Sequence, residues 1–254
     1  MRRLFWTAAS LGSAIAMVAA SAQAQSFPAR PITMIVPYAA GGSADVIGRL
    51  VAAEMSKTLG HNVVLELKPG AGGNFGAELV AKTARADGYT VLLGSLSLSS
   101  NPSLMKLNFD PRRDLVAVAG IATFPNLMVT AADGPIRSFK DAIAVARRKP
   151  GELTFGSSGP GTSSHLTGEL LKAAAGIDMT VVPYKGGAGQ FIAALLGNEA
   201  QAAMVNLASS IAHGRAGRMK GLATTWPRRR PELPGGPTMA RTGLPGIGTN
   251  AWNG

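Results

Sequence analysis

Residues that could do chemistry gather in four glycine-rich turns, at positions 39–43, 70–73, 157–164 and 186–189. Each turn stands between an apolar run and a segment with helical spacing. At the start of a helix, free N–H groups and the positive end of the helix dipole suit a carboxylate or a phosphate. Glycine also lets such a ligand approach the backbone without a Cβ in the way. Loop geometry alone explains any one of these turns, but four turns rich in serine and threonine favour anion binding.

The turn at 157–164 has an alternative interpretation as a nucleophile loop. Ser163 and Ser164 directly precede His165, so an exported α/β serine hydrolase that uses this loop is the alternative function. Residues one or two apart on a helix do not face each other. We therefore favour a hydrogen-bonding role for His165 at a helix N-terminus, and we assign no catalytic residue.

The sequence does not match other common motifs for catalysis, nucleotide binding or metal binding. The run 70–76 is one residue longer than the G-x-G-x-x-G dinucleotide fingerprint, and no G-x-x-x-x-G-K-[ST] phosphate loop is present. No G-x-S-x-G nucleophile elbow occurs. The three histidines, His61, His165 and His213, show no metal-ligand spacing, and the chain has no cysteine. We expect no cofactor and no metal.

The first residues are typical of an export signal. Arg2 and Arg3 form a positive end, residues 4–20 an apolar run, and residues 22–24 an A-x-A cleavage site. We therefore predict a signal peptide at 1–24, cleaved near Ala24, and a location in the periplasm. Because cysteine is absent, we expect no disulfide and no lipid attachment near the signal.

The charge of the chain is strongly positive. The formal net charge is +11, or +9 once the two arginines of the signal are removed. The chain has only 3 Tyr, 3 Trp and 8 Phe, and they are not interleaved with the basic clusters at 112–113, 147–149 and 228–230. We therefore expect no nucleic-acid partner, although a protein that binds anions or nucleic acid over its surface stays open as a third class. A positive field would favour the entry of small anions into a cleft. We expect a monomer.

The elements that must position the turns follow a strand–turn–helix order. Short apolar runs at 31–38, 63–67 and 88–95 predict strands, with helices after the first two turns. This order predicts a parallel sheet with helices on both faces. On the first helix, six apolar residues are expected to share the buried face: Val46, Ile47, Leu50, Val51, Met55 and Leu59.

The second half of the chain repeats the theme. Further strands are predicted near 127–132, 153–157, 179–184, 200–206 and 219–226. Ser138, with Asp141 three residues on, predicts the cap of one helix, and Thr162 or Ser163 the cap of the next. We infer two α/β lobes rather than one continuous sheet.

Two tyrosines end their strands at matching places. Tyr38 and Tyr184 both close a Val-Pro-Tyr run that leads into a glycine turn. Each could pack in a core with its hydroxyl satisfied. Because glycine turns follow them, we favour two rings that flank a cleft.

Six motifs occur in a specific order: VPYAAGGSADVIGR, KPGAGGNFGAELVAK, DGYTVLLGS, FGSSGPGTSSHLTGELLK, VPYKGGAGQFIAALLGNEAQAAM and GLATTWPRRRPELPGGPT. From about Pro31 onward they resemble the Bug (TctC-type) receptors, the extracytoplasmic solute-binding proteins of tripartite tricarboxylate transport systems. The resemblance implies a type II, Venus-flytrap periplasmic binding protein, an α/β fold with a central sheet and flanking helices in each lobe. It also implies a small carboxylate in the cleft between the lobes, membrane transporter subunits as partners, and no enzyme activity.

The resemblance further implies a set of ligand-binding residues. In lobe 1 they are Tyr38, Gly42, Ser43, Ala44, Gly72, Gly73, Asn74 and Ser95. In lobe 2 they are Ser158, Thr162, Ser163, His165, Tyr184, Lys185 and Gly186, of which Lys185 is the candidate for a direct charge pair.

The resemblance also implies the organisation of the chain. Lobe 1 is expected at 26–126, with 226–254 returning to it, and lobe 2 at 127–225. Because the family continues past this point with a strand and helices that complete lobe 1, the C-terminal part is expected to be missing. The identity of the carboxylate stays open.

Overall fold

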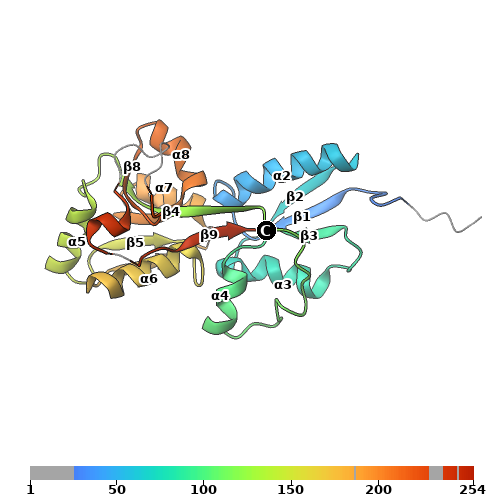
Figure 1. Cartoon of the computed structure of the whole chain (residues 1–254), viewed down its shortest axis with the longest axis horizontal. Helices are drawn as coiled ribbons and strands as arrows, with labels where there is room; N and C mark the ends of the chain where they lie inside the picture. Colours follow the sequence, from blue (N-terminus) through green and yellow to red (C-terminus); the bar gives the residue numbers. More distant parts are fainter. Residues whose placement is uncertain (1–25, 186, 229–236, 245) are drawn as a thin grey trace, which may run out of the picture.

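The structure is a computed structural model that describes residues 26–185, 187–228, 237–244 and 246–254. It confirms a two-lobed α/β fold, with one sheet and its helices in each lobe and two strands running between the lobes (Figure 1). The predicted signal peptide at 1–24, its cleavage site near Ala24 and the predicted ligand residue Gly186 lie outside the described residues.

Lobe 1 is built on a parallel sheet of three strands in the order β2-β1-β3. The central strand β1 (Ile32–Val36) is almost wholly buried between β2 (Val63–Leu67) and β3 (Thr90–Leu92). Because the three strands are parallel, their carboxyl ends meet at one edge of the sheet, where ligands bind in such folds. Around this sheet lie α2 (Ser43–Leu59), the short 3-10 helix η1 (Ala71–Gly73), α3 (Asn74–Thr83) and α4 (Ser97–Leu104).

Lobe 2 is built on a mixed sheet in the order β6-β5-β7-β4-β8, in which β5 pairs parallel with both neighbours and β4 pairs antiparallel with both of its own. The strands are β4 (Ala122–Ala131), β5 (Thr154–Ser157), β6 (Thr180–Pro183), β7 (Ala202–Asn206) and β8 (Met219–Thr224). The helices are α5 (Phe139–Arg148), α6 (Ser163–Ala175), α7 (Ala188–Leu196), α8 (Leu207–Arg215) and the 3-10 helix η2 (Met239–Thr242).

Two strands connect the lobes. The first four residues of β4 pair antiparallel with β9 (Asn250–Asn253), whereas residues 126–131 of β4 join the sheet of lobe 2. The end of β9 also reaches lobe 1, because Ser95 forms a bridge with Asn253 and Gly94 bonds the backbone of Gly254. This paired ribbon is the structural connection between the lobes (Figure 1).

The buried face of α2 differs from the predicted one. Val46 and Leu50 are 39% and 61% exposed, whereas Ala44 and Ala52 are buried. Gly48 lies between those two alanines, and a Cβ there would already be 3.1 Å from Val36 and 3.2 Å from Leu65. The helix therefore packs closely on the sheet through small residues four apart, which leaves Val46 and Leu50 exposed. Val51, Met55 and Leu59 of the predicted stripe still pack against the core of lobe 1.

Both predicted helix caps in the second half of the chain are present. The Ser138 side chain accepts a hydrogen bond from the Asp141 backbone, as expected for the start of α5. Of the two candidates for α6, Thr162 is the cap, and its hydroxyl accepts from the His165 backbone.

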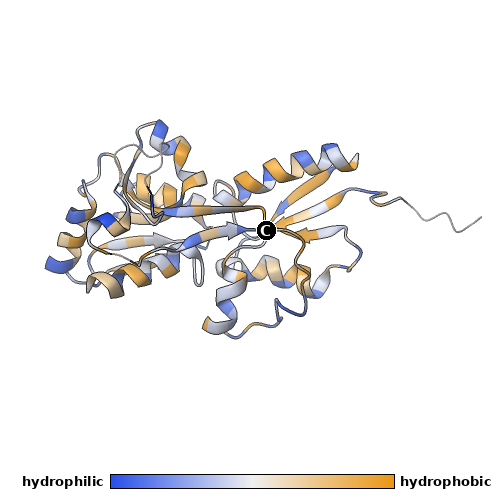
Figure 2. Cartoon of the chain, in the orientation of Figure 1, coloured by the Kyte–Doolittle hydropathy of each residue, from blue (hydrophilic) through white to orange (hydrophobic). Residues whose placement is uncertain are grey.

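The cores of the two lobes are separate and apolar. Residues buried in lobe 1 come from β1, α2 and the strands beside them, and those of lobe 2 surround the fully buried rings of Phe155 and Phe191. Figure 2 shows apolar residues along β1 and β2 and polar residues on outward turns of the helices. Within the described part of the chain, no helix has the length and apolar character needed to cross a membrane.

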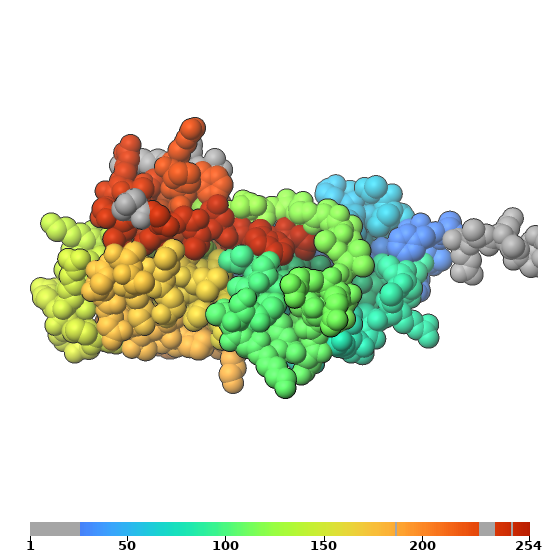
Figure 3. Space-filling view, turned by 60° about the horizontal axis from the view of Figure 1, so that its bottom comes forward, coloured from blue at the N-terminus to red at the C-terminus, as the bar shows by residue number. Residues whose placement is uncertain are grey.

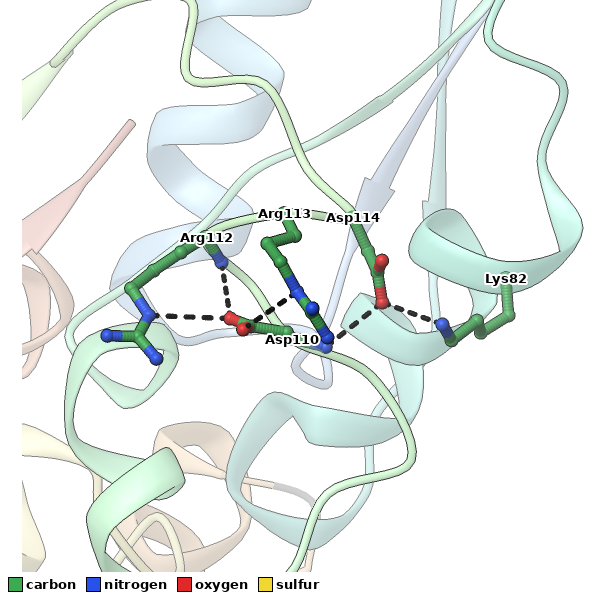
Figure 4. A network of polar contacts seen from close by, with 5 residues as sticks. All are labelled: Lys82, Asp110, Arg112, Arg113 and Asp114. Atoms are coloured by element: carbon green, nitrogen blue, oxygen red, sulfur yellow. Dashed lines mark hydrogen bonds and ion pairs between the residues drawn. The ribbon is translucent and has the colours of Figure 1, made fainter.

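A surface loop between α4 and β4 is fastened to α3 by charged contacts. Lys82 on α3 lies 2.6 Å from Asp114, and Arg113 lies 3.2 Å from Asp110 (Figure 4). The hydrogen bond from Lys82 lowers the pKa of Asp114, and the hydrogen bond from the Arg112 backbone lowers the pKa of Asp110. This loop lies outside the cleft described below.

Candidate ligand-binding cleft

A small cleft lies where the carboxyl ends of β1, β3, β5 and β7 meet between the lobes. It encloses a cavity of about 50 Å³. Eight of the predicted ligand residues line it: Tyr38, Gly42, Ser43, Ala44, Ser95, Ser158, Thr162 and Ser163. In Figure 3 the lobes touch along the face drawn, with atoms of α6 (gold) against atoms of the α4 region (green).

Tyr38 anchors the lobe 1 side through its hydroxyl. This group lies 2.6 Å from the Ser95 hydroxyl and 3.0 Å from that of Ser97, and it donates to the Gly72 carbonyl at 3.1 Å. Burial raises the pKa of Tyr38, an effect that the bonds to Ser95 and Ser97 partly offset. The phenol is therefore neutral at physiological pH, and it ties together three turns of lobe 1.

The two Val-Pro-Tyr turns face each other across the cleft. A Cβ on Gly41 would lie 3.5 Å from the Cα of Gly189, and one on Gly42 would lie 3.4 Å from the Ala188 Cβ. A Cβ on Gly189 itself would overlap the carbonyl oxygen of Ala40. Backbone therefore meets backbone here, and glycine is what permits the contact.

A second interlobe contact closes the opposite side of the cleft. A Cβ on Gly72 would overlap the carbonyl oxygen of Pro160, and the Ser100 hydroxyl on α4 donates to the Gly161 carbonyl at 2.6 Å. The lobes therefore touch on both sides of the cleft, here and where the two Val-Pro-Tyr turns meet, so they are closed on each other.

The helices that begin at the cleft differ in their caps. Helix α6 is capped by Thr162, but α2 begins at Gly42 with no side-chain cap. Gly42, Ser43 and Ala44 all line the cleft. The first N–H groups of α2 are therefore left for an external acceptor, and the dipole of the helix favours a negative one.

A buried polar network supports the lobe 2 side. The Ser163 hydroxyl lies 3.1 Å from Asn126 Oδ1 and 3.4 Å from Asn206 Oδ1. Asn126 is fully buried at the point where β4 leaves β9, and its Nδ2 donates to Thr167 and Thr249. The connecting strands and the cleft wall thus share one hydrogen-bonded network.

The remaining wall of the cleft is largely apolar and, among the described residues, carries no charged side chain. No Lys, Arg, Asp, Glu or His is among the described residues that line it. The residues that the predictions did not include are Leu96, Ser164, Ala188, Phe191, Met204, Asn206, Ala251, Trp252 and Asn253. The cleft therefore offers hydroxyl, amide and backbone donors next to apolar side chains, an arrangement suited to a small acid with an apolar part.

Three predicted residues of lobe 1 support the cleft without lining it. Gly72 and Gly73 lie beside the Tyr38 hydroxyl, and a Cβ on Gly73 would be 2.8 Å from that oxygen. Asn74 is buried, and its Oδ1 accepts from Asn101 on α4 at 2.8 Å. These residues hold the turn after β2 against α4.

Three predicted residues of lobe 2 also lie outside the lining. His165 follows the cap Thr162, with its backbone N–H bonded to that residue. The ring of Tyr184 packs 6.4 Å from the ring of Phe191, so it supports the wall rather than facing the ligand space. Lys185 is exposed, and the described lining does not include it.

Five of the nine lining residues that the predictions missed lie in the strands β7 and β9. Asn206 ends β7, and Ala251, Trp252 and Asn253 belong to β9, far along the chain from the glycine turns. The available signal was the position of Asn206 between a predicted strand and a predicted helix. Nothing local in the sequence places β9 beside Ser95.

Among the described residues no group of three or more His, Asp or Glu side chains could hold a metal ion. The donors of the cleft suit an anion instead, because hydroxyl and N–H groups can both donate to carboxylate oxygens.

Comparison with known proteins places the chain among transport receptors. Residues 47–254 match the family described as the tripartite tricarboxylate transporter family receptor. Protein BugT of Bordetella pertussis (strain Tohama I) is 37% identical over 94% of this chain and 74% of its own length. The solved structure of the periplasmic binding protein BugD has a TM-score of 0.85 at 33% identity, over 90% of this chain and 76% of that one. The structure of MatC from Rhodopseudomonas palustris with bound malate has a TM-score of 0.82 at 30% identity, over 90% and 78% of the two chains.

Proposed function

The chain belongs to the tripartite tricarboxylate transporter receptor family, and on that premise we propose that it captures a small carboxylate between its lobes in the periplasm. The closed, loaded form would then deliver the acid to membrane transporter subunits. The predicted signal peptide supports export, and we expect the exported protein to act as a monomer.

One observation carries this proposal: the uncapped start of α2 at the wall of an uncharged cleft. A carboxylate oxygen there would accept from the free N–H groups of Ser43 and Ala44 and supply the missing cap. The Ser95 hydroxyl lies on the same side. The apolar remainder of the acid would pack on Phe191, Met204 and Trp252.

The binding mode follows from the closed arrangement of the lobes. Glycine turns meet on both sides of the cleft, so the acid enters only when the lobes separate, and closure then surrounds it. Lobe 1 would supply the helix start and lobe 2 the hydroxyl of Ser158, because the hydroxyls of Thr162 and Ser163 already donate to Gly159 and Asn126. Each lobe alone would hold only part of the ligand.

The hydrolase alternative meets a specific obstacle in the serine loop. The Ser164 hydroxyl accepts from the Ser158 backbone at 2.9 Å, and the Ser163 hydroxyl donates to an asparagine oxygen. A serine nucleophile requires a base to accept its proton, and in this loop both hydroxyls are engaged as supports of the cleft wall. The relatives named above are receptors rather than hydrolases, which favours binding.

Thermal unfolding with a panel of acids tests the function. Malate, adipate, benzoate and glutamate are each added, with the matching amides or alcohols as controls. An acid present at 100 times its Kd adds about 2.7 kcal/mol to the free energy of unfolding, so at least one acid should raise Tm while its neutral analogue does not. Equal shifts with acids and neutral analogues would contradict carboxylate capture. Turnover of an ester, together with labelling of Ser163 or Ser164 by a serine-directed reagent, would favour the hydrolase.

A further inference from the structure

Asn206 stands at the start of α8 but does not cap it. Asparagine at this position normally accepts a hydrogen bond from its own helix, which stabilises the helix. Here the side chain makes no such bond. Instead its Nδ2 donates to the Ser43 hydroxyl at 2.7 Å, across the cleft and 163 residues away in the sequence. A residue that gives up local stability for a contact in a cleft is a candidate for function.

The Asn206 amide has one contact at each of its polar atoms, with Ser43 at the nitrogen and Ser163 at the oxygen. The Ser163 hydroxyl lies 3.4 Å from Asn206 Oδ1, and Ser163 is itself 3.1 Å from Asn126, the fully buried residue of β4. The single proton of the Ser163 hydroxyl is shared between the two asparagine oxygens, more closely with Asn126, and its contact with Asn206 Oδ1 favours that oxygen on the lobe 2 side. The NH₂ group is therefore presented to the cleft, where Asn206 acts as a donor.

The donor reaches the place where the acid would bind. Ser43 is the first residue of α2, whose uncapped N–H groups line the cleft, and Asn206 lines it from the other lobe. Among the described residues, this nitrogen donates one hydrogen bond, to Ser43. An amide nitrogen carries two N–H donors, so one remains for an oxygen of the ligand.

We propose that Asn206 is the lobe 2 donor that selects for an anionic oxygen, and that its bond to Ser43 joins the lobes over the bound acid. The inference rests on the proposed function and deepens it, because it assigns the polarity of the site to one amide. A carboxylate at residue 206 would keep the contact with Ser43, since both Ser43 and Ser163 could donate to it. The same carboxylate would repel an acid in a cleft that has no charged side chain to compensate.

Asn206→Asp is therefore the principal test, with Asn198→Asp as its matched control. Asn198 lies in the same lobe, is exposed and has a φ of 59°, a conformation that aspartate tolerates. Both variants add one negative charge to lobe 2. The Kd values for malate, adipate and benzoate are measured by the fluorescence of Trp252, which lines the cleft. For each acid that binds the unmodified chain, Asn206→Asp should raise the Kd about tenfold or more, the scale of a lost hydrogen bond to a charged group, and Asn198→Asp should leave it within about twofold.

Asn206→Ser separates a binding role from a structural one. Serine caps helices well but is too short to span the cleft, so Tm should be unchanged or higher while the Kd rises about tenfold or more. Asn206→Ser also tests whether Asn206 binds the acid in case Asn206→Asp fails to fold. Unchanged Kd values in both variants would overturn the inference and leave the proposed function standing. Failure of the unmodified chain to bind any of the acids would overturn the proposed function and this inference with it.

Discussion

At the scale of single residues, Tyr38 has the most connected side chain of the lobe 1 wall. Its hydroxyl bonds Ser95, Ser97 and the carbonyl of Gly72, so three turns depend on one oxygen. Tyr184, at the matching place in lobe 2, instead packs its ring against Phe191. The same Val-Pro-Tyr pattern therefore serves two purposes: a polar anchor in lobe 1 and an apolar support in lobe 2.

Tyr38→Phe should lower the free energy of unfolding by about 1 kcal/mol, because the buried Gly72 carbonyl loses its donor. It should also weaken binding of the acid, since Ser95 lines the cleft and loses the closer of its two hydroxyl partners. Urea unfolding followed by circular dichroism measures the first effect as a lower midpoint at an unchanged slope.

Tyr184→Phe serves as the control for this residue, and it should leave the midpoint nearly unchanged because it keeps the ring that contacts Phe191. Equal losses of stability in the two variants would show that the Tyr38 hydroxyl contributes no more to the free energy of unfolding than the Tyr184 hydroxyl does.

At the scale of elements, the feature that matters most is the contact between the turn after β1 and the start of α7. Backbone atoms of Ala40 and Gly41 meet Gly189 with no room for a side chain. Gly189 lies in the first turn of α7, where alanine is a better helix former than glycine. The glycine therefore costs α7 stability and serves the approach of the lobes.

Gly189→Ala should separate folding from closure. The added methyl group would overlap the Ala40 carbonyl only when the lobes are closed, so Tm without ligand should stay the same or rise slightly, while the Kd for the acid should rise about tenfold or more, as a steric cost of 1.4 kcal/mol or above implies. Calorimetric titration measures the Kd, and X-ray scattering measures the separation of the lobes.

Gly214→Ala on α8 is the matched control, because a Cβ there meets nothing within 4 Å. It makes the same chemical change in a helix of the same lobe and should leave the Kd unchanged. A Gly189→Ala variant that binds as tightly as this control would mean that closure does not require the glycine contact.

The order of most strands and helices was predictable from the sequence, because apolar runs followed by glycine turns specify a strand and then a helix, but α4 and β9 were not predicted. The face of α2 was not, since Gly48 allows close packing on the sheet and the exposed Val46 and Leu50 still belong to the apolar stripe. The glycine and serine turns of the cleft were likewise predictable from local pattern. Asn206 and Trp252 were not, because strand pairing over long sequence distances brings β7 and β9 to the cleft.

At the scale of the whole molecule, two different effects act on an anion. The chain has a formal net charge of +11, or +9 without the predicted signal peptide, yet no charged side chain is among the described residues that line the cleft. The net charge acts at a distance on the approach of an acid, whereas hydroxyl, amide and backbone donors hold it once the lobes have closed. Capture and retention should therefore respond differently to salt.

Ionic strength should slow the association of the acid without speeding its release. Between about 20 mM and about 500 mM salt the Debye length falls from roughly 20 Å to about 4 Å, so the field of the protein no longer reaches an approaching anion, and the association rate constant should fall several-fold. The dissociation rate constant should change by less than about twofold, because contacts inside a closed, uncharged cleft are screened little. Stopped-flow measurement of Trp252 fluorescence gives both constants with an acid that binds in the panel. A dissociation rate that rises in step with salt would contradict the uncharged cleft and point instead to an ion pair with an exposed cation such as Lys185.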